Sequence, residues 1–371
     1  MAGDDLRAPL GKTQKGVLLR LPYGLIGLTI ITLVLVTGFI WTNVVDDPLG
    51  GEPTAVVSLN YKPDGISRND IGIVDLGDGA NQPLSEAAIK AASAYGEGHA
   101  PAPTSLSQSP NAELVETGPY GLLPKVSAKG LQPLREYARP APAANAYQAR
   151  IAIVVSGIGQ SAAMSDIAIN DLPRDITLAL SPYGEALGQW VSKARRRGHE
   201  LLLQVPLEPF DFPSNDAGPQ SLLVNNKAAD NVDRLHWVLS RATNYVGLIN
   251  FMGGRFLSKE LSLQALMKET HKRGLMFMDD GNANGSQARK VARNTQVPFI
   301  GADLVLDSEL NSEDIGAQLL ELESIARRKG IAVASATAFP ITLKELKRWS
   351  QNLEARGLKL IPISAALNKP Q

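Results

Sequence analysis

Short apolar runs alternate with amphipathic stretches from about Tyr147 to the end of the chain. The runs are rich in β-branched residues, and their length is typical of buried strands. We predict strands over residues 151–155, 176–180, 200–205, 246–250, 275–278, 304–306, 331–334 and 358–361. Because a regular order of strand and helix builds parallel sheets, the pattern predicts an α/β fold with a parallel sheet or barrel.

Helical periods separate the predicted strands. Their apolar residues recur every three or four positions, which places them on one face of a helix. Two such sets are Val232, Leu235, Leu239, Ala242 and Ile315, Leu319, Leu322, Ile325. Basic residues followed by glycine mark predicted helix ends at Gly198, Gly274, Gly330 and Gly357. Glycine adopts the left-handed conformation that ends a helix, and the cations complement the helix dipole.

A longer uncharged stretch, Leu21 to Val45, lies near the N-terminus. Its 25 residues exceed a hydrocarbon core of roughly 30 Å at about 1.5 Å per residue, so we predict a transmembrane anchor over residues 21–45. The cations before it are Arg7, Lys12, Lys15 and Arg20. Since two aspartates follow it, residues 1–20 are predicted to form a cytoplasmic tail. A cleaved signal peptide is the alternative, but the residues after Trp41 offer no small-x-small cleavage site.

Residues 46–147 are rich in Pro, Gly, Ala and Ser, and their apolar residues are too scattered for a sustained helical or strand period. We predict a low-complexity linker, largely disordered, that leads to a domain over residues 148–371. Two alternatives stay open. Short pieces such as 55–59 and 122–126 could form local strands or dock on the domain, and residues 84–95 could form one amphipathic helix.

Charge and cysteine content narrow the function classes. Lys plus Arg and Asp plus Glu both number 37, and no basic stripe with interleaved aromatics occurs, so nucleic acid is not an expected partner. The chain has no Cys, which excludes disulfides and thiolate metal sites. The 4 histidines are not placed to converge on one ion in the predicted fold.

In parallel α/β folds the chemistry lies where strands end at their C-termini. The polar, aromatic and glycine residues at these predicted ends are Ser156, Gly157, Gly159, Ser181, Tyr183, Gln204, Glu208, Asn250, Phe251, Arg255, Asp279, Asp280, Asp307 and Thr337. A G-x-G-x-x-A string follows the first strand, but the next strand does not end on the acidic residue that dinucleotide binding requires. No G-x-S-x-G motif occurs, so a serine hydrolase is also poorly supported.

Seven segments in one order carry a family resemblance. They are IAIVVSGIG, ITLALSPYG, RRRGHELLLQVPLEP, GLINFMGGRF, RGLMFMDDG, PFIGADLVLDSE and IAVASATAFPITL. On these segments the domain from about Ala149 to Leu367 resembles the divergent polysaccharide deacetylase family, relatives of the NodB-type carbohydrate esterases. The resemblance implies a NodB-like distorted (β/α) barrel.

The same resemblance shows departures at the positions where the family pattern has metal-binding and catalytic side chains. Ser156 and Gly157 replace two carboxylates, Gln204 and Phe251 replace histidines, and Thr337 lies where a late histidine is implied. Metal-dependent deacetylation needs such ligands to polarise the acetyl carbonyl and activate water. The retained positions are Glu208, Asn250, Gly253, Arg255, Asp279, Asp303 and Asp307. We therefore expect no metal and no cofactor, although Asp279, Asp280 and Asp307 could offer an oxygen-only site for Mg²⁺ or Ca²⁺.

Two hypotheses about function follow. The first is a catalytically degenerate barrel, anchored in a bacterial inner membrane with its domain in the periplasm, that binds cell-wall glycan or a periplasmic protein. The candidate binding residues are Tyr183, Glu208, Asn250 and Arg255. The second is an active deacetylase of N- or O-acetylated polysaccharide that uses a reorganised site with a divalent metal, with Asp279 as the retained catalytic candidate. The catalytic residues, and whether the chain is an enzyme, stay open at this point.

Overall fold

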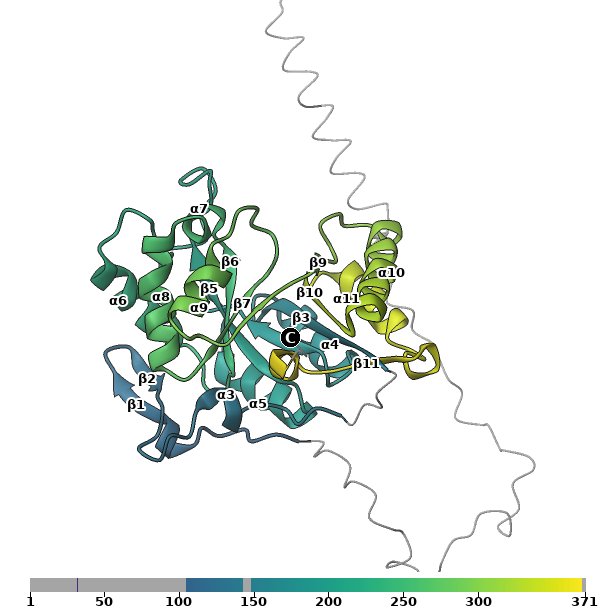
Figure 1. Ribbon diagram of the computed structural model, residues 1–371, viewed down its shortest axis with the longest axis horizontal. Helices are drawn as coiled ribbons and strands as arrows, with labels where there is room; N and C mark the ends of the chain where they lie inside the picture. The colour runs from purple at the N-terminus through teal and green to yellow at the C-terminus, as the bar shows by residue number, and fades with distance from the viewer. Residues whose placement is uncertain (1–31, 33–104, 143–147, 369–371) are drawn as a thin grey trace, which may run out of the picture. The chain divides into compact units, whose positions relative to one another are not determined.

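The computed structural model describes residues 32, 105–142 and 148–368 (Figure 1). The predicted tail over 1–20 and the predicted helix over 84–95 lie outside the described residues, as does the predicted anchor over 21–45 except for Thr32. In the part of the chain that is described, no helix is both long and apolar enough to cross a membrane.

A parallel sheet is the centre of the domain. Within the described residues its strands run in the order β8-β7-β6-β5-β4-β3-β10-β9, and β11 pairs with the start of β3. Their bounds are β3 (Ala149–Ile158), β4 (Thr177–Leu180), β5 (Leu201–Leu207), β6 (Gly247–Met252), β7 (Met276–Asp279), β8 (Phe299–Gly301), β9 (Leu304–Val305), β10 (Ile331–Thr337) and β11 (Leu358–Leu360). The predicted strands are confirmed within a few residues, and β8 is a further strand that the apolar pattern did not predict.

The sheet curls until its two edges, β8 and β9, are separated by only two residues of chain. The amide of Ala302 donates to the carbonyl of Asp279 in β7 at 2.9 Å, and the amide of Asp303 donates to the carbonyl of Val333 in β10 at 2.7 Å. No ladder joins β8 to β9 in the described part of the chain. The α/β class is confirmed, and the predicted distorted barrel takes the form of a curled half-barrel with this crossing at its seam.

Helices cover the outside of the curled sheet (Figure 1). They are α4 (Ala162–Asp171), α5 (Leu187–Arg197), α6 (Ala228–Leu239), α7 (Gly254–Leu257), α8 (Glu260–Lys272), α9 (Ala288–Asn294), α10 (Ser312–Lys329) and α11 (Pro340–Trp349). The apolar faces predicted for α6 and α10 are buried, as Leu235 and Leu322 show at 0% exposure. Gly198 and Gly330 cap α5 and α10 in the left-handed conformation, with φ of 93° and 74°. These helix ends are therefore confirmed.

Side chains of β3 alternate between two apolar clusters, as the period of a strand requires. Ile151 and Ile153 pack with the outer helices, whereas Ala152 and Val154 point into the half-barrel. The inner cluster continues at the N-terminal ends of the strands, where Leu114, Leu134, Tyr137, Ile363 and Ala366 belong to it. Segments from outside the sheet thus close this end of the half-barrel.

Residues 105–142, which we call the strap, supply three of those closing side chains. The strap contains η2 (Ala112–Leu114), β1 (Val115–Gly118), β2 (Gly121–Pro124) and α3 (Pro133–Glu136). Buried arginines hold it, since Arg195 donates to the carbonyl of Tyr137 at 2.7 Å and Arg273 to that of Pro124 at 3.0 Å. The prediction of a disordered linker is wrong for residues 105–142, and the local strand left open at 122–126 corresponds to β2. Residues 46–104 lie outside the described residues.

The apolar pattern did not predict the structure of the strap, because the buried residues of the strap are isolated along the chain. Leu114, Leu123, Leu134 and Tyr137 are 0 to 8% exposed, yet they are spaced too irregularly for a helix or strand period. A segment that docks on a preformed surface does not need a continuous apolar face of its own.

Candidate functional site

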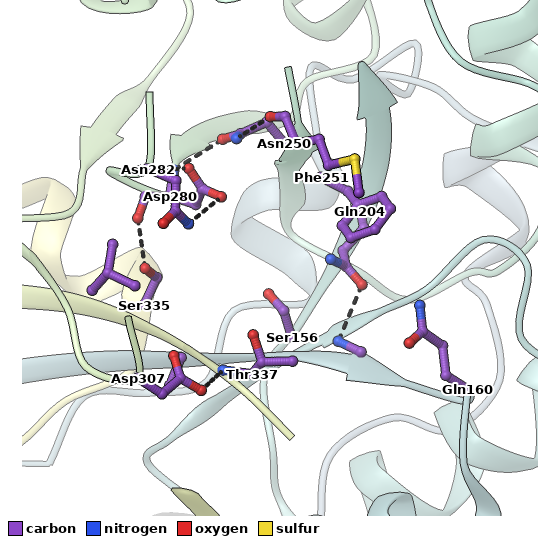
Figure 2. A pocket seen from close by; sticks show the side chains of 14 residues that line it. Ser156, Gln160, Gln204, Asn250, Phe251, Asp280, Asn282, Asp307, Ser335 and Thr337 are labelled. Atoms are coloured by element: carbon purple, nitrogen blue, oxygen red, sulfur yellow. Dashed lines mark hydrogen bonds between the residues drawn. The ribbon is translucent and has the colours of Figure 1, made fainter. Parts of the chain in front are cut away.

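A cavity of about 250 Å³ opens at the C-terminal ends of the strands (Figure 2). Its lining comes from β3, β5, β6, β9 and β10 and from the segments that follow β3, β7 and β9. The lining residues are Ser156, Gly157, Gln160, Gln204, Asn250, Phe251, Met252, Asp280, Asn282, Val305, Asp307, Ser335, Ala336 and Thr337. All five positions that depart from the family pattern, Ser156, Gly157, Gln204, Phe251 and Thr337, therefore lie in one cavity.

A hydrogen bond joins two of these substituted positions. The Oε1 of Gln204 accepts from the amide of Gly157 at 3.1 Å, which ties the end of β5 to the end of β3. Gly157 has φ of 90°, and the register between β3 and β4 shifts beside it. The bulge aims this amide at Gln204. Gln204 is 4% exposed, and its Nε2 has no partner within the described residues, so this amide donor is available to a ligand.

Asp307 lies on the opposite wall of the cavity. Its Oδ2 accepts from the amide of Thr337 at 2.7 Å and from the hydroxyl of Thr342 at 3.0 Å. Burial nevertheless raises the pKa of the Asp307 carboxyl above its ordinary value, because removal from water disfavours the charged form. The side chain holds the end of β10 to the segment after β9.

A second polar group surrounds Asp280. Its amide donates to the Oδ1 of Asn250 at 2.9 Å, and its carboxylate accepts from the backbone and side chain of Asn282 at 3.0 and 2.9 Å. The Nδ2 of Asn250 donates to the carbonyl of Met252 at 2.9 Å, so both ends of this amide already hold the backbone. Burial also raises the pKa of Asp280. The Ser335 hydroxyl donates to the Asp280 carbonyl and completes the group.

Asp279 points away from the cavity. Its Oδ1 accepts from the amide of Gly281 at 3.0 Å, and its Oδ2 accepts from the hydroxyl of Ser286 at 2.6 Å. Both bonds lie within its own loop, which is the arrangement of an aspartate that stabilises a turn. Of the three carboxylates considered for an oxygen-only metal site, the structure brings Asp280 and Asp307 to the cavity and not Asp279.

The described residues contain no group of three or more His, Cys, Asp or Glu side chains that could hold a metal ion. His199 lies before β5, at the far end of the half-barrel, where its two nitrogens lie 2.9 and 3.1 Å from the carbonyls of Ile176 and Ile169. Burial lowers the pKa of His199. His236 pairs with Glu269. His99 lies outside the described residues.

Two of the candidate binding residues form an ion pair beside the cavity. The Nη1 of Arg255 donates to the Oε1 of Glu208 at 2.7 Å, and the other carboxylate oxygen of Glu208 accepts from the amide of Val224. Glu208 is 2% exposed, and neither residue lines the cavity. The pair fastens the loop after β5 to α7, which is a structural arrangement.

Tyr183 also supports that loop. Its hydroxyl accepts from the amide of Gln220 at 3.0 Å, and its ring packs under Gly218, where an added Cβ would lie 2.6 Å from the ring. The ring lies 5.7 Å from that of Trp237. Burial raises the pKa of Tyr183. Among the candidates Tyr183, Glu208, Asn250 and Arg255, only Asn250 lines the cavity.

Sequence reasoning left several lining residues out of the candidate binding set. Gln160 and Asn282 lie in loops and carried no signal. Ser335 has one, because it follows Val333 by two positions in β10 and so faces the interior as Val333 does. Asp280 and Asp307 stand at strand ends, and the strand-end rule did mark them.

Other proteins are similar to this chain in sequence, and one of known structure is similar in fold. Residues 153–367 match the family model described as divergent polysaccharide deacetylase. The crystal structure of an uncharacterized protein from Agrobacterium tumefaciens C58 is similar to this chain, with 42% identity and a TM-score of 0.64 over 66% of this chain and 99% of that one. The uncharacterized protein YibQ of Escherichia coli K12 is 27% identical over 225 residues, which are 60% of this chain and 68% of that protein. An uncharacterized protein of Haemophilus influenzae Rd is 26% identical over 209 residues, 56% of this chain and 72% of its own length.

Proposed function

The chain belongs to the divergent polysaccharide deacetylase family, and on that premise we propose that its cavity binds carbohydrate without deacetylating it. The observation that carries this proposal is the chemistry of the lining at the substituted positions. The Nε2 of Gln204 and the hydroxyls of Ser156 and Thr337 have no hydrogen-bond partners among the described residues and line one cavity with the Phe251 ring. Sugar hydroxyls both donate and accept, so neutral amides and hydroxyls around a ring suit them.

A metal does not fit this lining. Zinc in hydrolytic sites takes imidazole and carboxylate ligands, and the cavity lining includes no histidine. Asp280 and Asp307 each already accept two hydrogen bonds from the protein. The residues present therefore offer no metal-assisted route to deacetylation.

An active deacetylase remains the second candidate, because one observation favours it. Asp280 and Asp307 share the cavity, and burial raises the pKa of both. A carboxyl with a raised pKa suits general acid or base catalysis near neutral pH. This candidate requires a reorganised site, since Asp279, which the family pattern retains, is turned into its own loop.

The location belongs to the same proposal. We propose that residues 21–45 anchor the chain in a bacterial inner membrane with residues 1–20 in the cytoplasm and the domain in the periplasm, where cell-wall glycan is the available polysaccharide. The charge asymmetry around residues 21–45 supports this orientation. A periplasmic protein is the other ligand class that the cavity leaves open.

Calorimetry on the full chain in detergent tests the proposal, with chitooligosaccharides and peptidoglycan fragments as probes. We expect binding, no acetate release with or without added Zn²⁺, and no change in Tm on adding a chelator. Gln204→Leu should weaken binding about tenfold because it removes the free amide donor, whereas Gln351→Leu on the exposed surface should not. Metal-dependent acetate release that is lost in Asp307→Asn would overturn the proposal and favour the deacetylase.

A further inference from the structure

The cavity is small for a polysaccharide. Its volume of about 250 Å³ lies below the roughly 300–1,000 Å³ of pockets for drug-sized ligands, so it has room for about one sugar ring. A glycan chain with one unit in the cavity must therefore continue over its rim, by which we mean the loops that follow the strands lining the cavity.

Two exposed phenylalanines come shortly after strands that line the cavity, Phe210 after β5 and Phe339 after β10. Phe210 is 65% exposed and Phe339 is 40% exposed. Among the other described phenylalanines, Phe256 and Phe277 are fully buried, and Phe212, Phe251 and Phe299 are half-buried. An exposed aromatic ring does not contribute the stability that the same ring would give in the core. Exposed rings that gather around a site therefore mark a binding surface. Leu310, at 53% exposure, follows the lining residue Asp307 by three residues.

Each of the two residues has a contact close to the cavity wall. The Phe210 ring packs on Gly254, where an added Cβ would lie 2.7 Å from its Cδ2, and Gly254 lies two residues beyond Met252 of the lining. The amide of Phe339 donates to the carbonyl of Thr337, another lining residue, at 2.8 Å. Strands β5 and β10, which precede the two residues, both line the cavity and are separated in the sheet by β4 and β3, so the two residues enter the rim from different positions around the curled sheet.

We infer that the cavity holds one unit of a longer, neutral glycan chain and that Phe210 and Phe339 carry the neighbouring units by stacking on their apolar C–H faces. This inference rests on the proposed function. A phenylalanine side chain has only two χ angles, so it loses little conformational entropy when it binds a ligand, which suits a repeated and flexible ligand.

The charge of the rim favours a neutral chain over an anionic polymer or an anionic membrane surface. The loop that carries Phe210 has Asp211 and Asp216 and no Lys or Arg between residues 208 and 226. Glu309 and Glu313 flank Leu310 on the other side. A lipid headgroup layer attracts basic residues, and this rim offers acidic ones.

Chain-length dependence tests the inference. Calorimetry on the full chain would compare chitooligosaccharides and cellooligosaccharides of one to five units. We expect the Kd to fall by at least about tenfold between one and three units and then to level off. Phe210→Ala and Phe339→Ala should each weaken trimer binding about tenfold and leave monomer binding unchanged, because the rings contact only the flanking units.

Phe210→Trp keeps a stacking surface and should retain trimer affinity. Leu122→Ala is the matched control, since Leu122 is 40% exposed on the strap. Equal affinity for monomer and trimer, or trimer binding unaffected in both alanine variants, would refute the inference and leave the proposed function standing. Absence of binding at every length in both series would overturn the proposed function together with the inference.

Discussion

The strap offers the most direct test of the structure, through the change Leu114→Ala in the full chain. Leu114 ends η2, is 0% exposed and belongs to the apolar cluster inside the half-barrel together with Leu134 and Tyr137. If residues 105–142 were a mobile linker, as their composition suggests, this leucine would be exposed and its truncation would cost nothing. The docked strap predicts a core substitution instead.

The size of the effect follows from this burial. Leu→Ala at fully buried positions costs about 2–5 kcal/mol, because apolar contact is lost and a cavity remains. That is a large share of the roughly 5–15 kcal/mol by which domains are stable. For a domain of this size, each kcal/mol lowers Tm by about 2–4 °C, so a loss of about 3 kcal/mol predicts a Tm lower by roughly 6–12 °C.

Urea unfolding followed by tryptophan fluorescence measures this difference, and an unchanged m-value shows that the unfolding reaction is the same. Leu122→Ala in the hairpin that follows Leu114 is the control, because Leu122 is 40% exposed and should lose less than about 1 kcal/mol. A free energy of unfolding for Leu114→Ala within about 0.5 kcal/mol of wild type would refute the docked strap.

Three further outcomes are expected. A periplasm-specific reporter fused after Gln371 should be active and a cytoplasm-specific one silent; the reverse pattern would reject the proposed orientation. Arg255→Ala should lower the free energy of unfolding by about 1–3 kcal/mol, because it leaves the buried Glu208 carboxylate without its ion pair. Glycan affinity measured by calorimetry should not change. Weaker glycan binding with an unchanged free energy of unfolding would instead make Arg255 a ligand contact. Burial raises the pKa of Asp307, so the folded state holds its proton at pH values above 3.8 where the unfolded state has lost it, and stability falls as pH rises through that window. Asp307→Asn should make the free energy of unfolding, measured with urea, depend less on pH in this window. If that free energy changes with pH equally in the variant and in the wild type, Asp307 is not the cause.

The sheet could be predicted from the sequence because parallel strands buried on both faces are continuous apolar runs. Ile151 to Val155 in β3 and Leu201 to Leu203 in β5 show this, since every residue of both runs is 0% exposed. Strand β8 was missed because Phe299 and Gly301 are half-buried at the seam and form no apolar run. The strap was missed because isolated anchors carry no period.

The site was predictable in part for a related reason. Strand ends locate residues along the chain, so the sequence alone assigns Gln204 and Thr337 to one end of the half-barrel. The position of a strand end does not give the direction of a side chain that comes after the strand. Gln204 and Asn250 lie within β5 and β6, where the strand fixes the direction of the side chain. Glu208 and Arg255 come after those strands, and they turn toward the loop over 208–226 and pair there.

The substituted positions form a connected arrangement rather than a set of independent losses. Gly157 occupies a left-handed bulge whose amide donates to Gln204, so a carboxylate-bearing residue at position 157 would meet an unfavourable backbone conformation that costs about 1–2 kcal/mol. Asp307 and Asn250, which the family pattern retains, are occupied by backbone amides and carbonyls around the cavity. The retained residues therefore maintain the shape of the cavity, and the replaced ones supply neutral hydrogen-bonding groups at its wall. The proposed binding function needs this division of roles, because it requires a cleft that keeps its shape and that is lined by groups able to bond sugar hydroxyls.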